Sequence, residues 1–454
     1  MKTHFIGIGG IGVSALARYY KSIGAEVSGS DLVASEIIDE LKAEGLPIFI
    51  GPHSDEHIKK DIDLVVFSAA INKENVEFKK AKELGIKTAK YSDALGEIAE
   101  DYYLICIAGT HGKSTTTSML SLILIEAGMD PTVIVGTKLK EFGNTNFHAG
   151  SSKPQKGFSK PLMLIEADEW SASFLSYKPD IIAITNIEED HLDYYNDLDH
   201  IIKTFNLFIG QMKDGGILIL SKEDSGSQTL FNELSGDDLK IHFCDEGEGI
   251  PEKEIKKALK VPGKHNLKNA LVANSVAKAL SVSDEDILSG LNSYEGVWRR
   301  FDERKLKING KEIIIINDYA HHPTEIMATL EAAREKYPDK TIWTVFQPHQ
   351  QQRTKFFIDK FAKAFDLTDN LILTNIYEVA GREKEEVTIT SQDLTNKIKE
   401  RWQDKGLSDK GLEEVSDFNK IAEIIKEKTE NGDVVLLMGA GDIWGINKNL
   451  FPQA

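Results

Sequence analysis

Between residues 105 and 117 the chain reads Ile105-Cys106-Ile107-Ala108-Gly109-Thr110-His111-Gly112-Lys113-Ser114-Thr115-Thr116-Thr117. An apolar run of strand length, Tyr103 to Ala108, leads into it, and a helical apolar period ending at Gly128 follows it. Strand, glycine turn, Lys-Ser and helix form the context of a phosphate loop, in which backbone N–H groups face the anion. Lys113 would reach the outer phosphates and Ser114 could hold Mg²⁺. The usual pattern has glycine where Ile107 stands, so the sequence predicts a shortened ATP site, with an ordinary strand–helix turn as the alternative.

The composition favours a globular protein that works on small molecules. The 454 residues are 41% apolar and 28% charged, and would form roughly three domains of about 150 residues each. The formal net charge of −18 argues against nucleic acid or an anionic membrane as the main partner. Cys106 and Cys244 offer neither a disulfide framework nor metal-ligand spacing. The sequence shows no secretory signal and no apolar run long enough to span a bilayer, so we expect a cytoplasmic protein without membrane insertion.

A second glycine motif opens the chain. Phe5 to Gly12 reads as a strand running into G-x-G-x-x-G, a helix follows from Val13 to Ile23, and Asp31 ends the next strand. Glycines without side chains let a pyrophosphate approach the backbone. The pattern predicts a Rossmann-like unit whose default ligand is a dinucleotide, although another diphosphate nucleotide or a purely structural turn would also fit.

Acidic residues follow two further strand patterns. Glu166-Ala167-Asp168-Glu169 follows the apolar run Pro161 to Ile165, and Glu188-Glu189-Asp190-His191 comes after Asp180 to Ile184. Carboxylates at the ends of strands beside a phosphate loop are where Mg²⁺ is held. A solvated loop is the alternative for the first cluster and a surface histidine for His191. Beside a phosphate loop and Glu166, the metal-ligand role is favoured for His191.

Two pairs of polar residues in the last third of the chain are further candidates. Asn266 and Asn269 lie three apart on one face of a helix that continues to Leu280, so they suit either a base edge or helix capping. Arg299 and Arg300 in an acidic chain suggest phosphate recognition, with a salt-bridged hinge as the alternative. Together the clusters favour phosphoryl transfer followed by attack of a second substrate over simple hydrolysis.

Alternating strands and helices predict the fold class, which is α/β with three domains. We expect a Rossmann-like N-terminal domain over 1–99, a central P-loop ATPase-type domain with a parallel-rich sheet over 100–297, and a C-terminal doubly wound domain over 298–454. Four other segments receive predictions: a helix-rich stretch at 74–100, a loop at 143–160, an outer strand at 215–220 and an acidic excursion at 225–254.

Several motifs together resemble the Mur ligases of peptidoglycan synthesis. They are G-T-x-G-K-[ST]-T (Gly109 to Thr115), E-A-D-E (Glu166 to Glu169), T-N-I-x-x-D-H (Thr185 to His191), H-N-x-x-N-A (His265 to Ala270), R-R-F (Arg299 to Phe301), D-Y-x-H-H-P-T-E (Asp318 to Glu325) and F-Q-P-H (Phe346 to His349). The motifs cover essentially the whole chain in the family's order. They are most similar to the branch that joins L-alanine to the carboxylate of UDP-N-acetylmuramate.

The resemblance implies an ATP-dependent reaction through an acyl phosphate, with Mg²⁺ and these site residues. ATP would contact Gly109, Thr110, His111, Gly112, Lys113, Ser114, Thr115, Asn266, Asn269, Arg300 and Asp318. Lys113, Glu166, His191 and Arg300 would be catalytic, with Ser114, Glu166 and His191 as metal ligands. The UDP-sugar would contact Gly9, Gly10, Ile11, Gly12, Asp31 and Ser68. The amino acid would contact His322, His349 and Arg353, the last pairing with its carboxylate.

The sequence departs from the family pattern at three places. Ala69 replaces a serine, Trp170 a small residue, and Gln350 to Gln352 the triplet Arg-Tyr-Thr. Ligases that add later residues have a modified lysine where this chain has Phe205-Asn206, which agrees with the first step of the pathway. A Mur-type ligase that adds another amino acid or a peptide is therefore the alternative, and we expect a monomer or homodimer. A nicotinamide oxidoreductase and a nucleotide-switched binding protein explain fewer motifs.

Overall fold

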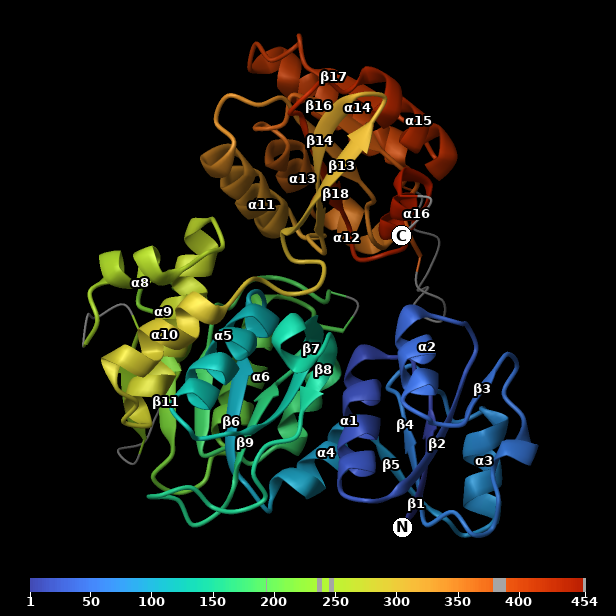
Figure 1. The fold of residues 1–454 in the computed structure, drawn as a ribbon, viewed down its shortest axis with the longest axis vertical. Coiled ribbons are helices and arrows are strands. Elements are labelled where there is room, and N and C mark those ends of the chain that lie inside the picture. The colour runs from blue at the N-terminus through green and yellow to red at the C-terminus, as the bar shows by residue number, and fades with distance from the viewer. Residues whose placement is uncertain (193, 235–238, 245–248, 379–388, 452–454) are drawn as a thin grey trace. The chain divides into compact units, whose positions relative to one another are not determined.

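Three β-sheets, formed one after another along the chain, make up the computed structural model, which describes residues 1–192, 194–234, 239–244, 249–378 and 389–451 (Figure 1). The chain packs into two compact units, and the residues of each unit come from several segments. One unit holds the first two sheets and is made of Met1–Glu188, Asp199–Ala258 and Asn269–Glu295. The other holds the third sheet and is made of Glu189–Leu198, Leu259–Lys268 and Gly296–Ala454.

The first sheet has five parallel strands in the order β3-β2-β1-β4-β5. The strands are β1 (Lys2–Ile6), β2 (Glu26–Asp31), β3 (Ile48–Ile50), β4 (Leu64–Phe67) and β5 (Lys87–Lys90). The helices are α1 (Ile11–Ser22), α2 (Glu36–Ala43), α3 (Val76–Glu83) and α4 (Tyr91–Ala99). Helices α1 and α3 lie on opposite sides of the sheet (Figure 1). The strand order reverses at β1, so a ligand crevice is expected at the carboxyl ends of β1 and β4.

The second sheet has seven strands in the order β12-β11-β10-β6-β9-β7-β8, and β8 alone runs antiparallel to its neighbour. The strands are β6 (Tyr103–Ala108), β7 (Thr132–Leu139), β8 (Thr145–His148), β9 (Leu162–Glu166), β10 (Ile181–Ile184), β11 (Ile217–Leu220) and β12 (Lys240–Phe243). The helices are α5 (Lys113–Glu126), α6 (Leu198–Ile209), α7 (Ser225–Glu233), α8 (Glu252–Ala258), α9 (Lys264–Ala279) and α10 (Asp284–Ser293). Strand β6 lies inside the sheet and leads directly into the loop before α5.

The third sheet has the order β13-β14-β18-β15-β16-β17, with β13 antiparallel to β14. Its strands are β13 (Asp302–Ile308), β14 (Lys311–Asp318), β15 (Ile342–Phe346), β16 (Asn370–Leu373), β17 (Gly411–Glu414) and β18 (Val434–Met438). Its helices are α11 (Pro323–Lys336), α12 (Gln351–Phe356), α13 (Ile358–Ala364), α14 (Ser391–Asp404), α15 (Phe418–Lys428) and α16 (Ile446–Leu450). Alternate strand residues face different helices: Leu436 packs in the core with α11, α13 and α14, whereas Leu437 packs in the core with α15 and α16. Helices therefore cover both faces, as in a doubly wound domain.

These sheets confirm the predicted fold class and correct two of the local predictions. The stretch 74–100 is helix-rich as predicted, with strand β5 between α3 and α4, but the predicted loop at 143–160 contains strand β8. Strand β11 is not the outer strand of its sheet, because β12 pairs beyond it. Strand β12 arises within the acidic excursion, of which 235–238 and 245–248 lie outside the described residues. No described helix combines the length and the apolar character that crossing a bilayer requires.

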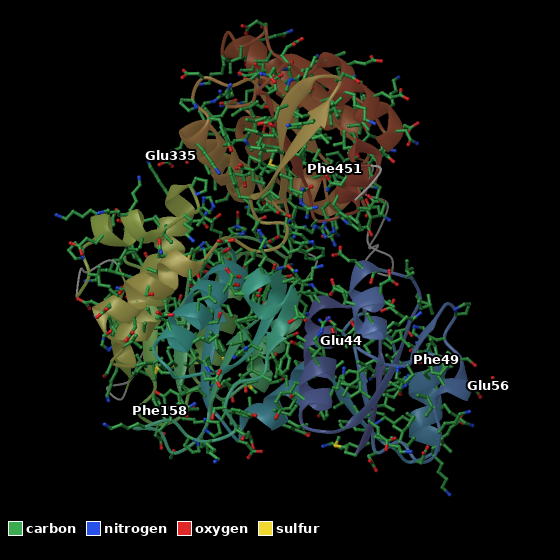
Figure 2. All side chains as sticks on the ribbon, viewed as in Figure 1. Glu44, Phe49, Glu56, Phe158, Glu335 and Phe451 are labelled. Atoms are coloured by element: carbon green, nitrogen blue, oxygen red, sulfur yellow. The ribbon has the colours of Figure 1, made fainter. Side chains whose placement is uncertain are left out.

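A buried polar junction joins the first two sheets within the first unit. Lys138 of β7 donates to Glu36 and, at 2.8 Å, to Glu40, both on α2, although its own side chain is only 5% exposed. Arg18 of α1, equally buried, donates from Nε to Glu44 Oε1 at 2.8 Å and from Nη2 to Glu40 at 3.4 Å. Glu44 is labelled on the side-chain view (Figure 2). Lys138 thus links α2 to strand β7 of the second sheet, and Arg18 links α1 to the same group of carboxylates.

Asn146 of β8 completes this junction and has no exposed surface. Its Oδ1 accepts from Arg18 Nη1, and its Nδ2 donates to the carbonyl of Ile11 and, at 2.9 Å, to Ser14 Oγ. A guanidinium only donates and a carbonyl only accepts, so this amide can be oriented in one way only. Asn146 therefore ties the first turn of α1, directly after the glycine motif, to the second sheet.

We expect Asn146→Asp to lower the free energy of unfolding by about 1–3 kcal/mol, the usual cost of leaving a buried polar group without its partner. Aspartate keeps the acceptor for Arg18 but places a second acceptor against the carbonyl of Ile11. Urea unfolding measures the change. The control is Asn144→Asp, two residues earlier on an exposed left-handed residue that aspartate tolerates. Equal stability of the two variants would contradict this account of the junction.

Candidate active site

The glycine motif of the first sheet forms a tight turn between β1 and α1. Gly7 has a φ of 77°, and the amide of Gly10 donates to the carbonyl of Gly7 at 3.3 Å. Gly10 caps α1 without a side-chain hydrogen bond, so the N–H groups of the first turn keep their capacity to bind an anion. A Cβ on Gly9 would lie 2.9 Å from Asp31 Oδ2, which explains why no larger residue fits there.

Asp31 and Ser68 lie beside this turn. Asp31 Oδ2 accepts from the amide of Gly9 at 2.8 Å, and its Oδ1 accepts from Val33 at 3.3 Å. The side chain predicted to meet a ribose hydroxyl thus also holds the glycine turn. Ser68 follows β4, and a Cβ on Gly7 would lie 3.0 Å from its Cβ. The structure therefore brings the candidate residues of the first sheet together at the carboxyl ends of β1, β2 and β4.

The phosphate loop lies between β6 and α5 and depends on two glycines with positive φ. Gly109 has a φ of 126°, and a Cβ there would lie 2.2 Å from Thr185 Oγ1. Gly112 has a φ of 82°, and a Cβ there would lie 2.2 Å from Asn269 Oδ1 on α9. Both the backbone conformation and the lack of space demand glycine. Asn269 therefore contacts the phosphate loop, whereas the sequence analysis gave it to the base of the nucleotide or to helix capping.

The segment after β10 braces this loop. The hydroxyl of Thr185 and the amide of Asn186 both donate to the carbonyl of His111, at 2.6 and 2.9 Å. Asn186 Oδ1 accepts in return from the His111 amide at 3.0 Å, and the Glu188 amide donates to Thr110 Oγ1 at 2.9 Å. The sequence analysis gave Thr185 and Asn186 no role, although both stand in the T-N-I-x-x-D-H motif.

Lys113 begins α5 and pairs with a buried carboxylate. Its Nζ lies 2.7 Å from Glu169 Oε2 and donates to the carbonyls of Gly109 and Thr110 at 2.6 and 3.1 Å. Burial alone would lower the pKa of Lys113, but the negative charges of Glu169 and its acidic neighbours raise the pKa to about 12. The lysine is therefore charged at neutral pH. Glu169, only 2% exposed, is a partner that sequence reasoning missed.

Glu166 and Ser114 come together at the carboxyl end of β9. Ser114 Oγ donates to Glu166 Oε1 at 2.9 Å, and the amide of Gly136 on β7 donates to Oε2 at 2.7 Å. Burial raises the pKa of Glu166 above its ordinary value, and Lys113 opposes this shift. A hydroxyl and a buried carboxylate are hard oxygen donors of the kind that Mg²⁺ prefers, and a cation would stabilise the charged carboxylate.

Arg300 and Asp318 lie together in the third sheet's unit. The amide of Phe301 donates to Asp318 Oδ2 at 2.9 Å, which holds the R-R-F segment at the end of β14. Arg300 Nη1 donates to Glu325 Oε1 at 3.2 Å, and its guanidinium lies 5.1 Å from the ring centroid of Tyr319. Burial would lower the pKa of Arg300, but the carboxylates of Glu325 and Asp318 raise it. The arginine is thus charged, and Glu325 holds its guanidinium in place.

Arg353 is held by Asp190, a residue to which the sequence analysis gave no role. Its Nε and Nη2 donate to Asp190 Oδ1 at 3.1 and 2.7 Å, and its Nη1 lies 3.2 Å from His349 Nδ1. Burial would raise the pKa of Asp190, but Arg353 and the nearby histidines hold it well below the ordinary range. His191, with a φ of 52°, donates its amide to the same Asp190 oxygen at 2.7 Å.

Two predicted residues have structural roles in the same unit. His322 caps α11, because its side chain accepts from the amide of Thr324 while Glu325 accepts from the His322 amide. Asn266 Nδ2 donates to the carbonyl of Pro262 at 2.6 Å, at the start of α9. This bond is not a helix cap, because a capping side chain accepts from the N–H groups of the first turn, and it leaves the side-chain carbonyl of Asn266 for another partner.

The fold and the phosphate loop define an α/β protein of the class that uses a nucleoside triphosphate. Three family models match the chain: "Mur ligase family, catalytic domain" over residues 2–103, "Mur ligase middle domain" over 107–277, and "Mur ligase, glutamate ligase domain" over 299–441. The chain belongs to the Mur ligase family, as its motifs predicted.

Curated relatives and solved structures agree with this membership. A UDP-N-acetylmuramate–L-alanine ligase of Acetivibrio thermocellus is 40% identical over 98% of this chain and 94% of its own length. One of Clostridium kluyveri is 40% identical over 100% of this chain and 98% of its own length. The crystal structure of a UDP-N-acetylmuramate–alanine ligase from Thermotoga maritima has a TM-score of 0.78 at 26% identity, covering 100% of this chain and 99% of that chain. A murein peptide ligase from Psychrobacter arcticus has a TM-score of 0.72 at 25% identity, covering 100% of this chain and 98% of that chain.

Lys113→Met should reduce ATP turnover about 100-fold or more, because a preorganised cation at the developing charge is lost. It should also lower the free energy of unfolding by about 3–5 kcal/mol, because Glu169 loses the partner of a buried ion pair. Adding Glu169→Gln should recover stability without recovering turnover. Urea unfolding and ADP release measure the two effects.

A control separates the buried pair from surface pairs. Lys178→Met breaks the exposed pair with Glu100, whose atoms are 2.8 Å apart, and should change stability by less than about 1 kcal/mol. If the double variant regains turnover, Lys113 acts only by neutralising Glu169 and not on the phosphates.

Proposed function

We propose that this protein is an ATP-dependent amide ligase that joins L-alanine to the carboxylate of UDP-N-acetylmuramate in peptidoglycan precursor synthesis. The observation that carries the proposal is the 40% identity, over essentially the full length, to ligases of that name. The phosphate loop with its buried acids and the charged arginines of the third sheet's unit supply the groups that such a reaction needs.

The reaction takes place in two steps. A carboxylate oxygen of the sugar attacks the γ-phosphorus of ATP, which forms the acyl phosphate and releases ADP. The amine of L-alanine then attacks the acyl carbon, and phosphate leaves as the amide forms. Lys113 and Arg300 would stabilise the charge on the transferring phosphoryl group, since both are charged and held in place by carboxylates. Mg²⁺, when bound, offsets negative charge on the phosphates.

Different groups of residues would bind ATP, Mg²⁺ and the UDP-sugar. Gly109 to Thr115 would bind the phosphates of ATP, Asn266 and Asn269 its adenine side, and Asp318 the nucleotide as well. Ser114 and Glu166 would hold Mg²⁺ through their adjacent oxygens. For His191 the metal role rests on the family motif. Gly9 to Gly12, Asp31 and Ser68 would bind the UDP-sugar. The division into domains at 1–99, 100–297 and 298–454 remains part of this proposal.

Arg353 would pair with the carboxylate of the amino acid, with His349 beside it. Asp190 fixes the orientation of the guanidinium. The His322 side chain caps a helix, so its contribution would be to shape the pocket rather than to bind directly. A pocket with one paired arginine suits a small, uncharged amino acid. Because the substrates are small, water-soluble metabolites, we place the reaction in the cytoplasm, without nucleic acid or membrane insertion, by a monomer or homodimer.

The second candidate is ligation of a peptide or of another amino acid, since a murein peptide ligase has a similar structure. A competition assay separates the candidates. We expect L-alanine to be consumed first from an equal mixture with L-serine, glycine, D-glutamate and L-alanyl-γ-D-glutamyl-meso-diaminopimelate. A single methylene is worth only about 1–3 kcal/mol, so serine and glycine should react more slowly rather than not at all. Preferential formation of the D-glutamyl or tripeptide product would refute the assignment of L-alanine.

Asp190→Asn should raise the KM for L-alanine about tenfold, equivalent to about 1.4 kcal/mol, and leave the KM for ATP unchanged. The neutral amide no longer holds the guanidinium of Arg353 by charge. Glu189→Gln is the matched control. Glu189 precedes Asp190 in the sequence, and its carboxylate pairs with the exposed Lys360 at 3.2 Å instead of with Arg353. A lower KM for L-alanine in Asp190→Asn would mean that Asp190 competes with the substrate instead of positioning Arg353.

A further inference from the structure

Tyr91 lies in the segment that connects the first sheet to the second. It is the first residue of α4 and follows β5 directly, at the carboxyl edge of the first sheet. Ligands of parallel α/β sheets bind along that edge. Helix α4 then leads to β6, which carries the phosphate loop. The position therefore places Tyr91 at the edge of the first sheet where the nucleotide-sugar is proposed to bind.

The tip of the Tyr91 ring lies against the first turn of α1. A Cβ on Gly12 would lie 3.0 Å from both Cζ and Oη of Tyr91, so a side chain at residue 12 would collide with the phenol. Gly12 belongs to the turn whose N–H groups are available to an anion. An anion bound to that turn would therefore have the Tyr91 hydroxyl as a neighbour.

The hydroxyl of Tyr91 is a donor in an acidic environment. It makes no hydrogen bond with any residue that the structure describes. Burial raises the pKa of Tyr91, and the charges of Glu166 and Asp168 raise it further, so the phenol is protonated at neutral pH. A lysine or arginine at this place would pair with those carboxylates. The neutral hydroxyl of Tyr91 can donate to a phosphate oxygen, and unlike a cation it would not form an ion pair with Glu166.

We propose that Tyr91 is a substrate-binding residue, whose hydroxyl donates a hydrogen bond to the sugar-bearing phosphate of the UDP-sugar. The sugar-bearing phosphate is chosen because the charges of Glu166 and Asp168 act on Tyr91, and the sugar carboxylate must extend towards those acids to meet ATP. This inference rests on the proposed function and adds a residue that the motifs do not contain.

The test compares Tyr91→Phe with the wild type in calorimetric titrations with UDP-N-acetylmuramate, UDP and UMP. Deleting a hydroxyl that binds a charged group should weaken UDP-N-acetylmuramate and UDP about 10- to 100-fold. UMP, which lacks the second phosphate, should bind as before, and the KM for ATP should not change. The control is Tyr20→Phe, which deletes the hydroxyl of a buried tyrosine near the other end of α1 from Gly12. This variant should match the wild type with all three ligands.

Circular dichroism establishes that the variants are folded, and phenylalanine preserves the ring that packs on Gly12. Unchanged UDP affinity in Tyr91→Phe overturns the inference, and so does an equal loss for UMP, because the contact would then lie elsewhere on the nucleotide. In both cases the wild type still ligates L-alanine, and the proposed function stands. A wild type that binds no UDP-N-acetylmuramate refutes the proposed function and this inference together.

Discussion

The conformation of the phosphate loop requires glycine at two positions, because neither position has room for a side chain. Gly109 lies against Thr185, and Gly112 lies against Asn269, each with a positive φ. The segment after β10 and the helix α9 therefore lie directly against the loop. In return, Thr185 and Asn186 hydrogen-bond the loop backbone from the side. Close approach and hydrogen bonding together preorganise the N–H groups without a bound anion.

Strand β7 connects this site to the first sheet. Gly136 donates its amide to Glu166, and Lys138, two residues later, binds the acidic face of α2. The adjacent strand β8 adds Asn146, which holds the first turn of α1. One β-hairpin thus contacts both the buried acid beside the phosphate loop and the helix that follows the glycine motif. The relative position of the two anion-binding turns of the first unit depends on buried hydrogen bonds rather than on a flexible linker.

The sequence predicted interior strands such as β1, β6, β9 and β10, and it predicted none of the edge strands β3, β5, β8, β12, β13 and β17. Interior strands such as β6 and β18 are uninterrupted apolar runs, because both faces and both neighbours are protein. Edge strands β5 (Lys-Thr-Ala-Lys) and β8 (Thr-Asn-Phe-His) are polar and short, as edges that avoid aggregation are. A motif identified Lys113 and the family resemblance identified Arg353. Their partners Glu169 and Asp190 lie 56 and 163 residues away, and no local pattern indicates which of several acids they meet.

The cations of these candidate sites share one feature, which is that each is paired with a carboxylate. Lys113 and Arg300 come from two different motifs and Arg353 follows a third, and each meets a carboxylate from another motif: Glu169, Glu325 and Asp190. Burying a lone cation would be costly, so the carboxylates keep these groups charged and oriented in an acidic chain. The same pairing weakens their attraction for stray anions, because each cation's charge is already largely balanced. A phosphate or carboxylate would then bind well only where backbone N–H groups, a metal ion or a neutral donor add to the cation. Specificity for a substrate with several anionic groups follows from that requirement, because a single anion would satisfy only part of it.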